Sequence, residues 1–212
     1  PNTTQGTLFE LPKPQLEAIS PKPEHVTLAA KLPPRLWLGG MSWSYRGWVG
    51  SVYGADSSEK QLAAHGLTAY ARHPLLRLVE IDRSYYEPLP VQTLRDFADQ
   101  VPDDFRFFVK AHEDCTVPKF PLHARYGKKR GQDNARFLDP NYAERAVVES
   151  VCAGLGQKLG GILFQFPPHE VTAPRRFAEQ LHAFLRGLPR GIPYAVELRN
   201  DELFTPESGA AL

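Results

Sequence analysis

The chain has 212 residues and a formal net charge of +1, with 42% hydrophobic and 23% charged residues. These values are typical of a globular domain with a sizeable core, and they exclude a partner attracted by strong overall charge. No apolar run approaches the ~18 residues of a membrane span, so we expect no membrane association. Two cysteines, Cys115 and Cys152, are too few for a disulfide scaffold and favour free thiols and a cytoplasmic location.

The N-terminal segment is rich in proline. Residues 1–34 hold seven of the 20 prolines, and we expect them to form an extended arm rather than a packed unit. Within this arm, the stretch from Gln5 to Phe9 resembles the short peptides by which bacterial DNA-maintenance proteins bind the sliding clamp. The alternative is a tail that folds back on the domain through Leu8 and Phe9, and the sequence leaves both open.

Apolar segments alternate with amphipathic stretches along the rest of the chain. The predicted strands are residues 36–41, 76–81, 105–110, 160–166 and 194–199. Helices with one apolar face are expected to begin at an Asp56–Glu59 capping box, at Pro90, at Asp139 and at Thr172. Strands that alternate with helices predict right-handed βαβ units and a single parallel sheet.

Two α/β architectures fit this order, a doubly wound open sheet and a TIM-type barrel. No GxGxxG or P-loop motif follows the first predicted strand, which weakens the nucleotide-binding open sheet. Reactive residue types end the strands, and this favours the barrel, whose active sites lie at the carboxyl ends of its strands. Because barrels typically need ~250 residues, we predict a (β/α) barrel with about five βα units visible, forming one domain over residues 35–212 that is truncated at its C-terminus.

Several of these residues together resemble the YecE-like family, catalogued as domain of unknown function 72. The resemblance covers about residues 36–204 and rests on Gly39, the aromatic loop up to Tyr53, Glu80, Ile81, Tyr86, Val109, Lys110, Leu159, Gly160, Leu163, Gln165, Pro167, Pro168, Glu197 and Arg199. It implies a TIM-barrel-like fold without a settled activity. The chain departs from the usual family pattern at Met41, Ser42, Asp82, Arg83, Asn200 and Leu203. A shared pocket therefore does not imply a shared ligand.

Charged and aromatic side chains gather at the predicted carboxyl ends of the strands. We predict Glu80 and Glu197 as general acid and base, with Lys110 between them as a third catalytic group. The side chains predicted to bind ligand on this face are Trp43, Tyr45, Asp82, Tyr86, His112, Gln165 and Arg199. The alternative is a structural network of buried ion pairs, Glu80–Lys110 or Glu197–Arg199, with the aromatic rings as core or rim packing.

A local basic run follows the third predicted strand. Its predicted ligand-binding residues are Arg125, Lys128, Lys129 and Arg130. Such a run either holds phosphate groups or is a solvated loop. A divalent metal held by Glu80, His112 and Glu197 is a less favoured alternative, because no HExxH or CxxC spacing is present, and no cofactor is assigned.

These observations favour an enzyme-like barrel, a hydrolase or an isomerase. Its partner would be a small polar or anionic ligand, such as a phosphorylated sugar or a nucleic-acid end. The rival hypothesis is a non-catalytic, nucleic-acid-associated module that uses the basic loop 123–136 and the N-terminal tail.

Overall fold

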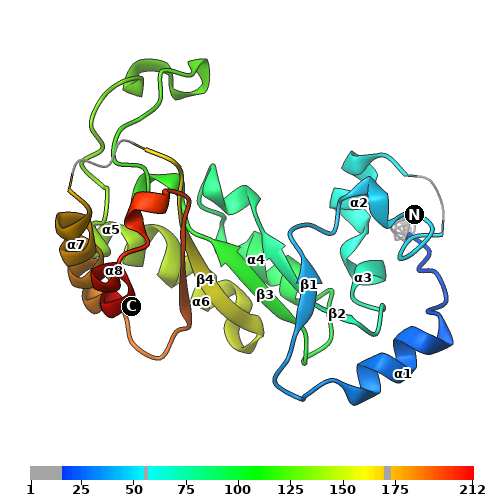
Figure 1. Ribbon diagram of the computed structural model, residues 1–212. Helices are drawn as coiled ribbons and strands as arrows, with labels where there is room; N and C mark the ends of the chain where they lie inside the picture. The colour runs from blue at the N-terminus through cyan, green and yellow to red at the C-terminus, as the bar shows by residue number, and fades with distance from the viewer. Residues whose placement is uncertain (1–15, 55–56, 170–172) are drawn as a thin grey trace, which may run out of the picture.

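The computed structural model describes residues 16–54, 57–169 and 173–212. One sheet of five parallel strands, in the order β1-β2-β3-β4-β5, runs through it (Figure 1). The strands are Leu38–Gly40 (β1), Leu76–Ile81 (β2), Arg106–Lys110 (β3), Leu159–Phe166 (β4) and Tyr194–Leu198 (β5). All five strands lie within two residues of their predicted bounds, and together they form half of a TIM-type barrel, as the sequence predicts.

Helices pack on one side of this sheet and at its two flanks (Figure 1). They are Pro23–Lys31 (α1), Glu59–His65 (α2), Leu67–Tyr70 (α3), Val91–Ala98 (α4), Pro140–Ala143 (α5), Glu149–Leu155 (α6), Pro174–Gly187 (α7) and Pro206–Ala211 (α8). Since neighbouring residues of a strand point to opposite faces, every second strand side chain meets the helices. Val79, Phe107 and Phe164 belong to this set and are fully buried in the core.

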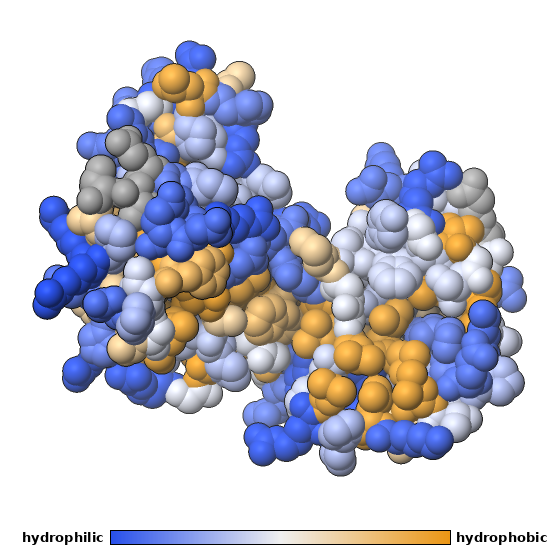
Figure 2. Space-filling view, in the orientation of Figure 1, coloured by the Kyte–Doolittle hydropathy of each residue, from blue (hydrophilic) through white to orange (hydrophobic). Residues whose placement is uncertain are grey.

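The opposite face of the sheet has no helix over it in the part of the chain that the structure describes (Figure 1). Figure 2 shows the molecule hollowed above the sheet, between the loop 111–139 and the region of α2. The register pairs Leu78 with Arg106 and Glu80 with Phe108, so these residues share the open face. Lys110 follows Phe108 by two residues and points to the same side. Glu80 and Lys110 therefore lie on the face of the sheet that no described helix covers.

The N-terminal segment differs from the expected extended arm where it is described. Residues 23–31 form α1, with Pro23 in its first turn. Proline is well tolerated there, because the first N–H groups of a helix have no partner within the helix. Ala18 also forms an antiparallel bridge with Tyr53, flanked by a hydrogen bond from Ile19 N to Val52 O of 3.0 Å. The clamp-like peptide from Gln5 to Phe9 lies outside the described residues.

The helix starts agree with the sequence only in part. Asp139 caps α5 by accepting a hydrogen bond from Asn141 N at 2.9 Å, as predicted. The capping box before α2 is formed by Ser58 and Gln61 instead of by the predicted pair that begins at Asp56, which is outside the described residues. Pro90 is the residue before α4 instead of its first residue. Thr172, the fourth predicted start, is also outside the described residues, and α7 begins at Pro174.

The cysteines and the helix lengths bear on two further expectations. Cys115 is buried, Cys152 is partly buried, and both thiols are free, as the sequence predicts. Burial raises the pKa of both thiols. Within the described ranges, no helix combines the length and the apolar character needed to cross a membrane.

Strand β1 is short and is attached to β2 through a helix side chain. The Tyr70 hydroxyl, from α3, donates to Leu78 O at 3.1 Å and accepts from Gly40 N at 2.7 Å. The pairing register shifts between Leu38 and Gly39 at this point. A Cβ atom at Gly39 would lie 1.9 Å from Leu78 O, so only glycine allows the two strands to approach this closely.

Candidate functional site

Lys110 lies between two carboxylates at the carboxyl end of β3. Its Nζ atom is 3.1 Å from Glu80 Oε1 and donates a short hydrogen bond to Asp82 Oδ1. The Lys110 side chain is 6% exposed and that of Glu80 13%, while Asp82 is 43% exposed. Glu80 Oε1 is buried, and Lys110 is its one partner within the described residues, so the lysine compensates its charge. The predicted ion pair is thus present, and Asp82 shares it.

Two groups of this cluster, Glu80 and Lys110, have shifted pKa values. Burial raises the pKa of the Glu80 carboxyl, and the nearby Lys110 ammonium offsets only part of that effect. Burial also disfavours the charged form of Lys110, but its bonds to Asp82 and Glu80 outweigh this and raise its pKa. Glu80 is therefore the carboxyl of this group that holds its proton to higher pH than usual.

A third carboxylate, that of Glu197, lies one residue before the end of β5. Glu197 Oε2 accepts from Gln165 Nε2 at 2.7 Å, and Glu197 Oε1 accepts from Arg199 Nε at 2.7 Å. Burial raises the pKa of Glu197, but these two hydrogen bonds outweigh it, and the net pKa is lowered. The Glu197 charge also contributes to the raised pKa of Glu80, and Lys110 contributes to the lowered pKa of Glu197. The predicted acid, base and lysine thus lie within electrostatic reach of one another.

A pocket of about 430 Å³ opens beside Glu80 at the carboxyl ends of β1 and β2. Its lining residues are Met41, Ser42, Trp43, Ser44, Glu59, Ala63, Glu80, Ile81, Asp82, Arg83 and Tyr86. Four of the residues predicted from the sequence, Trp43, Glu80, Asp82 and Tyr86, are among them. The Trp43 ring is largely buried and its Nε1 donates to Ala63 O at 3.2 Å, whereas the Tyr86 ring is exposed. The pocket therefore has one fixed and one accessible aromatic wall.

Ser84 holds the strand ends together below this pocket. Its Oγ lies 2.7 Å from Ile81 O and 2.6 Å from Lys110 O, and the side chain is buried. Because a hydroxyl has one proton, it donates to one of the two carbonyls at a time. This contact joins the end of β2 to the end of β3, where Asp82 and Lys110 meet.

Four of the side chains predicted to bind ligand on this face do not line the pocket. Gln165 and Arg199 bind Glu197 instead, and the other two are Tyr45 and His112. Tyr45 is 65% exposed, and its ring packs edge-on against Trp48 without lining the pocket. His112 is buried, and its Nδ1 is 2.8 Å from the Tyr142 hydroxyl. Burial lowers the pKa of His112, which favours its neutral form. His112 thus acts as a packed, hydrogen-bonded core histidine.

The basic loop is largely neutralised by two acids of its own. Arg125 Nη2 is 2.5 Å from Glu113 Oε2, and the Arg125 guanidinium lies over the rings of Tyr86 and Tyr126. Asp114, whose side chain is 3% exposed, binds Arg136 Nη1 at 2.8 Å and Lys129 Nζ at 3.4 Å.

Lys128 and Arg130 differ from their neighbours. Within the described residues, neither of them forms an ion pair, and both are exposed. Of the four predicted cations, only these two remain available to an external anion.

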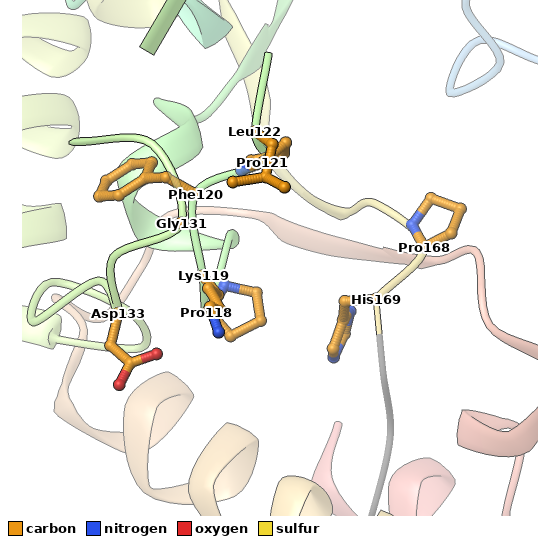
Figure 3. A pocket seen from close by; sticks show the side chains of 9 residues that line it. All are labelled: Pro118, Lys119, Phe120, Pro121, Leu122, Gly131, Asp133, Pro168 and His169. Atoms are coloured by element: carbon orange, nitrogen blue, oxygen red, sulfur yellow. The ribbon is translucent and has the colours of Figure 1, made fainter. Parts of the chain in front are cut away.

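A second pocket of about 620 Å³ lies between this loop and the segment after β4. It is lined by Pro118, Lys119, Phe120, Pro121, Leu122, Gly131, Asp133, Pro168 and His169. Figure 3 shows Pro118 and His169 on opposite sides of it. None of the residues predicted to act in catalysis or binding lines this pocket, and most of its walls are apolar.

The sequence also left open a divalent metal ion held by Glu80, His112 and Glu197. Within the described part of the chain, no group of three or more His, Cys, Asp or Glu side chains is placed to hold a metal ion. The Nδ1 atom of His112 meets Tyr142, and Lys110 already contacts Glu80.

The sequence analysis missed four polar residues of the first pocket, namely Ser42, Ser44, Glu59 and Arg83. Arg83 directly follows Asp82, so the same position after a strand could have identified it. Glu59 comes from the first turn of α2, and no strand-based pattern predicts that a helix start reaches this pocket.

The half-barrel of parallel strands, with polar groups at its carboxyl edge, defines an α/β protein of TIM-barrel type. Residues 37–212 match the family described as "Protein of unknown function DUF72", and the chain belongs to this family. This confirms the resemblance stated from the sequence.

Relatives and solved structures agree with this assignment. The chain is 30% identical over 144 residues to the UPF0759 protein YunF of Bacillus subtilis (strain 168), covering 66% of this chain and 44% of YunF. Two DUF72 family structures, EF0366 of Enterococcus faecalis V583 and TM1631 of Thermotoga maritima MSB8, each match with a TM-score of 0.52 at 22% identity. These matches cover 81% and 83% of this chain, and 54% and 60% of those chains. The chain therefore spans about half the length of these proteins.

Proposed function

We propose that the pocket beside Glu80 is the acid–base site of an enzyme that acts on a polar, hydroxyl-bearing ligand. The observation that supports it best is the opposite shift of two carboxyl groups around one lysine. The pKa of Glu80 is raised by burial, and that of Glu197 is lowered by its hydrogen bonds from Gln165 and Arg199. Carboxyl groups whose environments separate their pKa values are suited to opposite roles in proton transfer.

In this proposal, Glu80 donates a proton from the pocket wall, and Glu197, which lies outside that wall near the end of β5, accepts one. Glu80 lines the pocket, so its carboxyl can reach a bound ligand. Lys110 compensates the negative charge that remains on Glu80 after proton transfer, since its Nζ is already 3.1 Å from Oε1. Tyr86 offers a stacking surface, and Ser42 and Ser44 supply hydroxyl groups within the same pocket. Hydrolysis and isomerisation of a phosphorylated sugar or of a nucleic-acid end both fit this arrangement.

The test is turnover of a panel of phosphodiesters and sugar phosphates, with and without a divalent metal ion. We expect Glu80→Gln and Glu197→Gln to reduce kcat by roughly 10²–10⁴-fold on any substrate found, each removing a different limb of the pH profile. Glu24→Gln, on the exposed helix α1, is the matched control and should behave as the parent. Two glutamine variants with parental turnover would refute the assignment.

A second candidate is the nucleic-acid-associated module, and it is favoured by Lys128 and Arg130 alone. If this loop binds DNA or RNA, neutralising both residues should reduce the log–log salt slope of binding by roughly 2. The paired residue Arg125 supplies the control, since its charge is already taken by Glu113. If the affinity and its salt slope are the same in the Lys128→Gln/Arg130→Gln variant as in the parent, this candidate function is wrong.

A further inference from the structure

The pocket beside Glu80 is lined by one cation, Arg83, that has no acidic partner among the residues that the structure describes. Arg83 lines this pocket and is exposed, and it forms no ion pair within the described residues. Three other cations near this edge are already paired. Their carboxylate partners are Glu80 and Asp82 for Lys110, Glu113 for Arg125 and Glu197 for Arg199. An incoming anion would have to displace an existing pair at each of those three residues, but not at Arg83.

The chemistry of a guanidinium indicates what Arg83 would bind. Its planar set of N–H donors matches the two oxygens of a phosphate or carboxylate group, and such charge-assisted bonds are stronger than neutral ones. Because the side chain sits on the wall of a concave site, a ligand could contact it while its remainder fills the pocket.

The other walls of the pocket suit the rest of the same ligand. The Glu59 and Asp82 carboxylates are hydrogen-bond acceptors, which repel an anion but accept bonds from hydroxyl groups. The exposed Tyr86 ring can cover the apolar face of a sugar ring. Acceptors, an aromatic face and one free cation together match a polyhydroxylated molecule that carries a single anionic group.

We propose that Arg83 is the residue that selects a sugar bearing one phosphate or carboxylate group over the corresponding neutral sugar. This inference rests on the proposed function of the same pocket and adds the substrate class to it. Arg83 is a specificity residue, and it leaves proton transfer to Glu80 and Glu197.

The experiment is calorimetric titration of the full chain with four probes: glucose 6-phosphate, glucuronate, glucose and inorganic phosphate. We expect the parent to bind at least one of the two charged sugars more tightly than it binds glucose. Arg83→Gln should lower the affinity for that charged sugar by roughly ten- to hundredfold and leave the affinity for glucose unchanged. Arg83→Lys should retain part of the preference, because the charge stays while the paired donors are lost. Arg176→Gln removes an exposed arginine of α7 outside the pocket and serves as the control.

The outcomes separate this inference from the proposed function. Comparison of glucose 6-phosphate with glucuronate identifies which anionic group is preferred, and inorganic phosphate shows whether the anion alone suffices. A parent that binds all three sugars equally, or an Arg83→Gln variant that keeps the preference, would overturn the role of Arg83. Either result would leave the acid–base proposal standing, since that proposal is decided by turnover of the Glu80 and Glu197 variants. If the parent binds none of the four probes, the proposed role of Arg83 is also wrong.

Discussion

Lys110 Nζ is 3.1 Å from a buried oxygen of Glu80 that has no other partner within the described residues. The contact is therefore a largely buried ion pair, and the lysine offsets part of the cost of burying the Glu80 carboxylate. Asp82 does not depend on Lys110 in the same way, because its side chain is 43% exposed and can reach water.

This difference predicts the effect of removing the lysine. Lys110→Met leaves the Glu80 carboxylate buried without a cation, and we expect the free energy of unfolding at neutral pH to fall by about 3–5 kcal/mol. The double variant Lys110→Met/Glu80→Gln removes both charges and should regain most of that loss. Urea denaturation of the parent, both single variants and the double variant gives the coupling energy. Simple additivity of the two single changes would contradict this account of the pair.

The two glutamates should affect stability with opposite dependence on pH. The Glu80 pKa lies above the ordinary value of 4.5, so its favourable contribution is complete below 4.5 and is lost as pH rises through the raised value. The Glu197 pKa lies below 4.5, so its contribution is present above 4.5 and is lost as pH falls through the lowered value.

Glutamine variants test this directly, since their side chains do not titrate. Relative to the parent, Glu80→Gln should gain stability as the pH rises from about 4 to about 8. Glu197→Gln should be less stable than the parent at neutral pH and should approach it as the pH falls below 4.5. The measurement is the free energy of unfolding of all three proteins across this range. Curves that run parallel to the parent would show that neither carboxyl is shifted.

Asp114 and its two cations should respond unequally to substitution. The Asp114 side chain is 3% exposed, whereas Arg136 and Lys129 are 53% and 55% exposed. Removing both cations strands a buried carboxylate, and we expect Arg136→Ala/Lys129→Ala to cost about 3 kcal/mol. Asp114→Asn leaves cations that can reach water, and it should cost only about 1 kcal/mol. Chemical denaturation ranks the two, and a larger loss for Asp114→Asn would reverse the argument.

Packing of α4 against α6 depends on a glycine. A Cβ atom at Gly154 would lie 2.4 Å from Leu94 Cβ, so Gly154→Ala must push the two helices apart. We expect a loss of about 1–3 kcal/mol. The matched control is Gly209→Ala in α8, where the added Cβ would meet nothing within 4 Å and the helix gains up to ~1 kcal/mol. Thermal unfolding of both variants checks the difference in sign.

The sequence predicted the sheet well, because buried strands are continuous apolar runs. It also predicted the ion pair between Glu80 and Lys110, since parallel strands place their carboxyl ends at one edge. The contact between Lys110 and Asp82 was not predicted, because it depends on how the chain turns after β2. Ser84, which joins that turn to β3, is buried there, and no sequence period indicates this.

The long loop was less predictable. In the sequence, Arg125 and Lys129 belong to a basic run, and Glu113 and Asp114 stand at the start of the same loop. The structure pairs these groups across 12 to 15 positions of irregular backbone. Such pairing depends on the return path of the loop, and composition and periodicity contain no information on that path.

Helix α3 does not line the pocket, but its Tyr70 side chain holds the strand that leads into one pocket wall. The Tyr70 hydroxyl oxygen accepts a hydrogen bond from Gly40 N and donates one to Leu78 O. It therefore links the backbones of β1 and β2 through a side chain. Met41 and Ser42 continue directly from that anchored strand into the pocket. This wall of the pocket therefore depends on a side chain of a helix that does not line it, so we expect a substitution of Tyr70 to change the pocket without altering one lining residue.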